Sequence, residues 1–200
     1  MEIDKLIKEF QEKLDNPSIP ILDIVQRHLT YGTPVAFKDD EDTYFEIKKR
    51  IATQFDIAPE DVFMVGSGKL GFSLNTDQLW KPYDEESDMD MVIVSDKVFS
   101  SFWYQLYEFN IDITDRTKEE DKRYKKFLKY FLKGWIRPDF FPEAFKGNEE
   151  WEDFFTGTMS YKKEYGGRKI TGAVYREPFF YESYHKRNLE KIRLERMLKK

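Results

Sequence analysis

Two short segments carry the residues in this chain that are best suited to chemistry. The first, Gly66-Ser67-Gly68, is a glycine-serine turn that follows a short apolar run. The second, Asp88-Met89-Asp90, begins a strongly apolar run. Since residues i and i+2 of a strand share a face, the two aspartates are expected to project together while Met89 and Met91 enter the core. Paired carboxylates repel each other, and a bound cation is the usual reason to keep both ionised.

These two segments together predict a site for a metal ion and a phosphorylated ligand. Backbone N–H groups of Gly66–Gly68 could hold phosphate oxygens, with the Ser67 hydroxyl as a further donor. Glycine permits a close approach of the backbone to a ligand. Lys69 would neutralise phosphate or be an ordinary exposed lysine. The simpler alternatives are an ordinary turn for the glycines, and a loop cap or a surface calcium site for Asp88 and Asp90.

Periodicity and chain breakers predict the elements that position these residues. Three strands are expected, and seven helices are expected around them, one of which would begin with Asp96 as its N-cap. The predicted strands are 62–65, 89–94 and 170–175, and the predicted helices are 3–14, 20–29, 42–55, 98–109, 118–132, 151–159 and 184–197. With no repeat or convincing linker, we interpret residues 1–200 as a single domain with N-terminal helices and a basic C-terminal helix.

The glycine-serine turn and the paired aspartates resemble the signature of the polymerase-β-like nucleotidyltransferase superfamily. That signature is a Gly-Ser turn after one strand and Asp-x-Asp on the next. Gly66-Ser67 and Asp88-Met89-Asp90 match it within residues 62–94. The long spacing and the Ser-Asp-x-Asp ending are similar to those of cyclic-oligonucleotide synthases and related bacterial defence enzymes. The resemblance implies an α+β fold, a small mixed β-sheet of the nucleotidyltransferase type packed with several helices. It also implies Asp88 and Asp90 as catalytic metal ligands and Gly66, Ser67, Gly68 and Lys69 as nucleotide-binding residues.

The chemistry of nucleotidyl transfer explains this pattern. Attack on the α-phosphate expels pyrophosphate, so charge develops on both the attacking and the leaving oxygen. Two Mg²⁺ (or Mn²⁺) ions about 3.5–4 Å apart can stabilise both oxygens. The family pattern places a third acid on a later strand, but the predicted strand 170–175 has no carboxylate. Glu177, Asp112 and Asp139 are the alternatives, or there is none, in which case the fold would bind a metal–nucleotide complex without activating a hydroxyl.

The composition excludes several classes of protein. The chain has 200 residues, 40% of them hydrophobic and 17% aromatic, and its formal net charge is −5. It has no cysteine, which excludes disulfides, thiolate zinc sites and a cysteine nucleophile. No apolar run approaches transmembrane length and no signal peptide is recognisable, so a cytoplasmic protein without membrane contact is expected. Two basic stretches, 118–137 and 184–200, each carry a local charge of +5 and are either phosphate-attracting or simply solvated helix faces.

Other candidates are weaker taken singly. Four basic residues near predicted turns or strand ends could contact a triphosphate or an acceptor, or be surface charges. The two histidines, His28 and His185, lack metal-ligand spacing. Most aromatic residues are expected in the core rather than stacked on a base. The four basic residues are Arg137, Arg168, Lys169 and Arg176.

The leading functional hypothesis is therefore a magnesium-dependent nucleotidyltransferase that uses a nucleoside triphosphate. Its acceptor could be RNA, another nucleotide, a protein or a small molecule, and the resemblance implies a role in antiphage (antiviral) defence. The alternative is a catalytically inert nucleotide-binding sensor, or the regulatory partner of an effector protein. A nucleic-acid-binding module is a third reading, against which the net charge and the acidic residues of 84–90 weigh.

Overall fold

The computed structural model describes residues 2–112, 116–142 and 145–199, with only the backbone described at 111 and 112. These residues form eight α-helices and a four-stranded mixed sheet, which confirms the α+β expectation. The strands are β1 (Val62–Val65), β2 (Met89–Val94), β3 (Trp135–Ile136) and β4 (Ile170–Tyr175). The helices are α1 (Glu2–Asp15), α2 (Ile21–Val25), α3 (Glu41–Phe55), α4 (Gly66–Leu70), α5 (Asp96–Asp112), α6 (Lys118–Phe131), α7 (Lys146–Glu152) and α8 (Pro178–Met197).

The sheet has the order β1-β2-β4-β3. β1 pairs with β2 in antiparallel fashion, β2 and β4 are parallel neighbours, and the short β3 is antiparallel to β4. The parallel pair requires a long crossover connection, which here includes α5, α6 and α7. This arrangement brings residue 90 beside residue 171, far away in the sequence.

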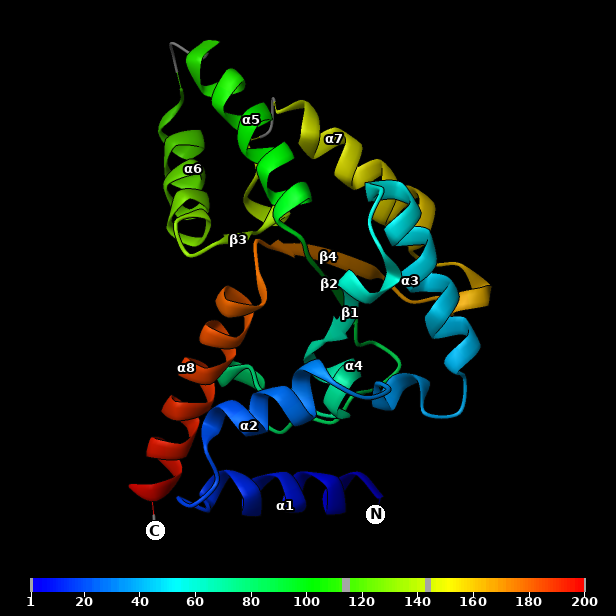
Figure 1. The fold of residues 1–200 in the computed structure, drawn as a ribbon, viewed down its shortest axis with the longest axis vertical. Coiled ribbons are helices and arrows are strands. Elements are labelled where there is room, and N and C mark those ends of the chain that lie inside the picture. The colour runs from blue at the N-terminus through cyan, green and yellow to red at the C-terminus, as the bar shows by residue number, and fades with distance from the viewer. Residues whose placement is uncertain (1, 113–115, 143–144, 200) are drawn as a thin grey trace.

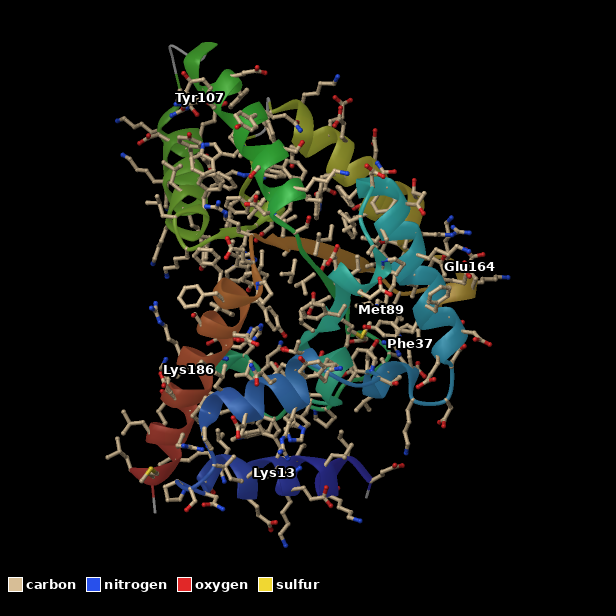
Figure 2. All side chains as sticks on the ribbon, viewed as in Figure 1. Lys13, Phe37, Met89, Tyr107, Glu164 and Lys186 are labelled. Carbon is tan, nitrogen blue, oxygen red and sulfur yellow. The ribbon has the colours of Figure 1, made fainter. Side chains whose placement is uncertain are left out.

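Each face of the sheet packs on its own hydrophobic core. Met89 and Met91 are buried in a core shared with α3, α5, α6 and α7, as the strand alternation predicts. The other face, which carries Val92 and Tyr175, packs against α1, α2 and α8. Figure 1 shows α5, α6 and α7 at one end of the molecule and α1, α2 and α8 at the other, with the sheet between them. Met89 lies in the interior of this arrangement (Figure 2).

Some element boundaries differ from the sequence-based expectation. The last helix begins at Pro178 rather than at residue 184, because proline at the first helical position has a φ angle already suited to a helix. The helix expected at 20–29 divides into α2 and a π-helical turn, Gln26–Thr30. That expected at 151–159 divides into the end of α7 and the π-helical segment Asp153–Met159. β3 is not among the predicted strands, since two residues carry no periodic signal.

No described helix combines the length and the hydrophobicity that crossing a lipid bilayer would require.

Candidate functional site

Asp90 lies beside Thr171 at the start of two parallel strands. The two are register partners in the β2–β4 pair, so their side chains project from the same face of the sheet. The Thr171 hydroxyl donates a hydrogen bond of 2.7 Å to Oδ1 of Asp90. A threonine, rather than a carboxylate, therefore neighbours Asp90 on β4.

The second oxygen of the Asp90 carboxylate lies against Gly66. A Cβ atom built on Gly66 would come within 2.6 Å of Oδ2 of Asp90, closer than real Cβ contacts allow. Gly66 also has φ +67°, a conformation that side-chain-bearing residues rarely adopt. The expected glycine turn is in fact the start of the short helix α4. Glycine is required here both for the backbone conformation and for the close approach to the carboxylate.

Asp88 and Asp90 are near enough to influence each other electrostatically, although Asp88 is exposed and Asp90 is half-buried. Burial raises the pKa of the Asp90 carboxyl, and the charge of Asp88 adds to this rise. The Thr171 hydrogen bond, Lys169 and Arg137 lower the pKa and partly oppose the effect. The folded protein therefore disfavours the ionised form of Asp90, and a bound cation would stabilise that form.

We expect Asp90→Asn to raise the thermal stability of the protein at neutral pH. Because the folded state holds this proton more tightly than the unfolded chain, stability falls as pH rises from the ordinary value of 3.8 through the raised pKa, and the penalty persists above it. Asparagine removes the charge and keeps an acceptor for Thr171. A gain of about 1 kcal/mol would appear as a rise in Tm of roughly 2–4 °C in a calorimetric scan. A lower Tm at neutral pH would contradict this account of Asp90.

Asp90 and Thr171 line a cleft of about 770 Å³. Arg137, Asp139 and Lys169 line the same cleft, so two of the four basic candidates share it with Asp90, whereas Asp88 is not part of its lining. Arg137 donates to both carboxylate oxygens of Asp139, at 3.1 and 2.7 Å, and its guanidinium lies over aromatic rings. Lys169 is exposed. The cleft therefore combines carboxylates that suit a metal ion with cations that suit phosphate.

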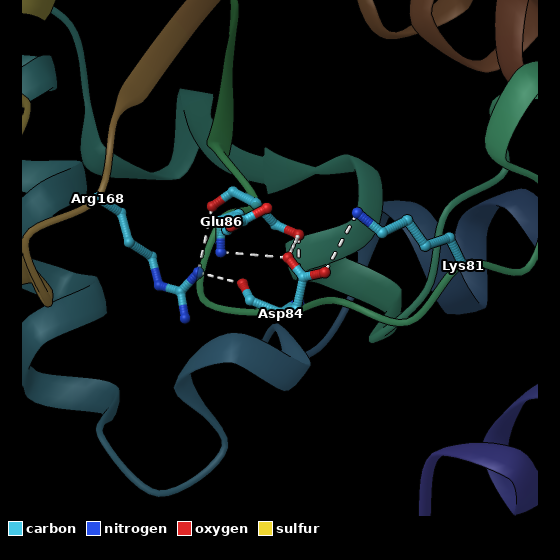
Figure 3. Close-up of polar contacts among 5 residues, drawn as sticks. Lys81, Asp84, Glu86 and Arg168 are labelled. Atoms are coloured by element: carbon cyan, nitrogen blue, oxygen red, sulfur yellow. Dashed lines mark hydrogen bonds and ion pairs between the residues drawn. The ribbon is translucent and has the colours of Figure 1, made fainter.

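The loop before β2 is fixed by Asp84 (Figure 3). The Asp84 carboxylate accepts hydrogen bonds from the Ser87 hydroxyl at 2.8 Å and from the Glu86 N–H at 3.2 Å, and pairs with Lys81 at 3.2 Å. The bonds from Ser87 and Lys81 hold the pKa of Asp84 below its ordinary value. Arg168 ties this loop to the residues before β4, since its guanidinium donates to the main-chain carbonyls of Asp84 and Ser87. Arg168 thus holds the segment that leads into Asp88 and does not line the cleft.

We expect Arg168→Gln to loosen this loop and to lower the stability of the protein by about 1–3 kcal/mol, because charged hydrogen bonds to carbonyl oxygens are lost. Amide hydrogen exchange of residues 84–88 should accelerate, while the exchange of α8 should not. Arg187→Gln, at an exposed arginine on α8, removes the same charge and is the matched control. Unchanged exchange in the loop of the Arg168 variant would show that the loop is held by other contacts.

The remaining nucleotide-binding candidates lie outside the cleft. Ser67 is half-buried, and its carbonyl accepts from the Gly71 N–H at 2.8 Å. Gly68 packs against Met64, whose sulfur would lie 2.7 Å from an added Cβ. Lys69 is only 5% exposed, and its ammonium donates to the main-chain carbonyls of Tyr31 and Gly32. Of residues 66–69, only Gly66 lines the cleft.

The three candidates for a third acid lie in different parts of the structure. Asp139 lines the cleft in its pair with Arg137. Glu177 precedes α8, with its carboxylate 3.7 Å from Arg176, and is not part of the cleft lining. Arg176 itself pairs with Asp96 at 2.7 Å. Asp112 ends helix α5 rather than lying in a strand, and its side chain is outside the described residues.

Within the part of the chain that the structure describes, no three His, Cys, Asp or Glu side chains come together around a common metal position. Asp88 and Asp90 alone offer two carboxylates, so a cation held by them would need phosphate or water oxygens as its other ligands.

No family model, curated protein or solved structure matches this chain.

Several residues of the site were missed from the sequence. Thr171 carries no signal of its own, and only the strand register brings it to Asp90. Glu152 and Tyr184 enter the cleft lining from α7 and α8. His185 also lines the cleft, and burial lowers its pKa to about 4, so the ring is neutral at physiological pH. Tyr83 lies near both aspartates, its hydroxyl buried without a hydrogen-bond partner in the described structure, and burial is the main reason that its pKa is raised.

Proposed function

We propose that the cleft binds a nucleoside triphosphate together with one Mg²⁺ (or Mn²⁺) ion, as a nucleotide-binding site rather than a site of rapid nucleotidyl transfer. Asp88 and Asp90 would hold the cation, and Lys169 and Arg137 would face the phosphates. The observation that carries this proposal is Thr171, the neutral register partner of Asp90, at the place of an expected acid.

A third carboxylate would meet needs of nucleotidyl transfer that Thr171 does not meet. Nucleotidyl transfer needs charge stabilisation at both the attacking and the leaving oxygen, and the attacking hydroxyl must lose its proton. A threonine that donates its hydrogen to Asp90 supplies neither a negative ligand for a second cation nor a base. Two aspartates, by contrast, suffice to anchor one cation that is already coordinated by a triphosphate.

Gly66 supports the same assignment. Oδ2 of Asp90 occupies the space that a side chain at position 66 would need. A ligand bound to a cation at Asp90 would therefore also lie close to the main chain of Gly66. The cleft volume of about 770 Å³ is within the range of small-molecule and cofactor sites.

The test measures equilibrium binding of nucleoside triphosphates with and without Mg²⁺, followed by pyrophosphate release over long incubation with total RNA present. We expect metal-dependent binding that is lost in the Asp88→Ala/Asp90→Ala variant, with little or no pyrophosphate released. The matched control is Asp121→Ala/Asp153→Ala, which removes two exposed or half-buried acids on α6 and after α7.

Two outcomes would overturn the proposal. Rapid pyrophosphate release that depends on Asp88 and Asp90 would make the protein a nucleotidyltransferase, the second candidate, for which Asp139 in the cleft lining provides another acid. Absence of metal-dependent nucleotide binding would remove the nucleotide from the function altogether.

A further inference from the structure

A second cavity, of about 230 Å³, lies among the N-terminal elements and does not share the lining of the Asp90 cleft. Its walls come from α1, from the π-helical turn after α2 and from α4, elements that lie together at the lower end of the molecule in Figure 1. Lys13, Arg27, His28 and Lys69 bring four nitrogen-bearing side chains to this cavity. Figure 2 labels Lys13 on α1.

These basic groups face one another with little compensating negative charge. The pKa of His28 is lowered, first by burial and then by the positive charges of Lys13, Arg27 and Lys69. No ion pair of Lys13, Arg27 or Lys69 is found in the described part of the chain. Glu9 is the one carboxylate of the described lining, and it lies 3.9 Å from Lys5 on the same helix.

The cavity differs from a patch of surface lysines because one of its cations, Lys69, is buried. Its side chain is 5% exposed, and two of its three N–H groups are directed to the carbonyls of Tyr31 and Gly32. Burial lowers the pKa of Lys69 to about 8, and the nearby charge of Lys48 adds to this effect. An ammonium group buried without a carboxylate is costly, and an anion beside it would offset that cost.

We propose that this cavity binds a phosphate group between Lys13, Arg27 and Lys69. A phosphate oxyanion has several acceptor oxygens and can take hydrogen bonds from all three cations at once, whereas a halide ion offers a single acceptor atom. The site is separate from the proposed metal–nucleotide cleft and needs no divalent cation. It lies at the far end of the same short helix, α4, whose first residue is Gly66.

Phosphate binding can be measured from the NMR signals of the two histidines. We would follow the ring signals of His28 and His185 by ¹H–¹³C NMR without metal, at a fixed pH near the His28 midpoint, while adding inorganic phosphate or adenosine monophosphate. Chloride at equal ionic strength is the ion control, and His185, which lines the Asp90 cleft and not this cavity, reports separately on any binding there. Phosphate binding should shift the His28 signal saturably and raise its pKa, because the anion offsets the surrounding positive charge.

Saturation by inorganic phosphate would identify free phosphate as a sufficient ligand, and saturation by the nucleotide alone would identify a phosphate carried by a nucleoside. Both results support the proposal. An equal response to chloride, or none to either probe, would overturn it.

The variant that tests the residues is Lys13→Gln/Arg27→Gln, since both side chains are exposed and their removal should leave the fold intact. We expect its phosphate affinity to fall by about tenfold or more. Lys125→Gln/Lys186→Gln removes the same charge from exposed positions on α6 and α8 and should bind normally. Equal losses in the two variants would show that only net charge matters and would overturn the assignment. Because metal and nucleoside triphosphate are absent, this result is independent of the test of the Asp90 cleft.

Discussion

Thr171→Asp is expected to turn the paired aspartates into a stronger metal site. The new carboxylate would project beside Asp90, its register partner, on the same face of the sheet. Adding a third negative ligand to Asp88 and Asp90 should raise Mn²⁺ affinity by roughly tenfold or more, because cation affinity increases with the number of charged ligands. Isothermal titration calorimetry with Mn²⁺ measures the change directly.

The same substitution should weaken the metal-free protein. It replaces the donor that binds Oδ1 of Asp90 by a like charge, so we expect a loss of about 1–3 kcal/mol that added Mn²⁺ reverses. Thr171→Asn is the matched control, since asparagine is similar in size and can donate to Asp90 without adding charge. If the Asp and Asn variants bind Mn²⁺ equally, position 171 does not neighbour the cation.

Pyrophosphate release provides a second readout of this variant. If the absence of a third acid is what limits the site, Thr171→Asp should release pyrophosphate from a nucleoside triphosphate faster than the unmodified protein and faster than Thr171→Asn. Tighter metal binding without any gain in release would show that a base or an acceptor site is also missing.

The sequence predicts three of the four described strands because the residue types at their ends mark their boundaries. β1, β2 and β4 have the expected limits, since each apolar run is bounded by polar residues or glycine. The alternation along β2 correctly places Met89 and Met91 in the core. Local pattern is thus sufficient to identify which residues of β2 face away from that core.

Non-local geometry could not be predicted in the same way. Which residue of β4 lies beside Asp90 depends on the register of two strands about 80 residues apart, and nothing in a single strand specifies it. Likewise, the Lys69 side chain points to the main-chain carbonyls of Tyr31 and Gly32, which lie nearly 40 residues away in the sequence. Of the motif residues, Gly66 and Asp90 line the cleft, whereas the neighbour at position 171 and the selection of Arg137 and Lys169 from four basic candidates come only from the fold.

Gly66→Ala is expected to destabilise the site by backbone strain and by a steric collision together. The added Cβ would meet Oδ2 of Asp90 at 2.6 Å, and alanine would also be forced to adopt φ +67°. The left-handed conformation alone costs about 1–2 kcal/mol. The steric conflict must then be relieved by moving the carboxylate or the start of α4, so we expect a total loss of roughly 2–4 kcal/mol, at the upper end for one substitution.

Substitutions at two other glycines allow the backbone strain and the steric collision to be measured separately. Gly166 has φ +73° with open space around it, so Gly166→Ala reports the backbone strain without a collision. Gly157, also in open space and without a positive φ, reports neither effect. Thermal unfolding should therefore rank the variants in the order Gly157→Ala, Gly166→Ala and Gly66→Ala, from least to most destabilised. Only Gly66→Ala should also weaken Mn²⁺ binding, since only there does the methyl group displace a proposed metal ligand. If Gly66→Ala lost no more stability than Gly166→Ala and kept full metal affinity, the close contact between Gly66 and Asp90 would have no part in forming the site.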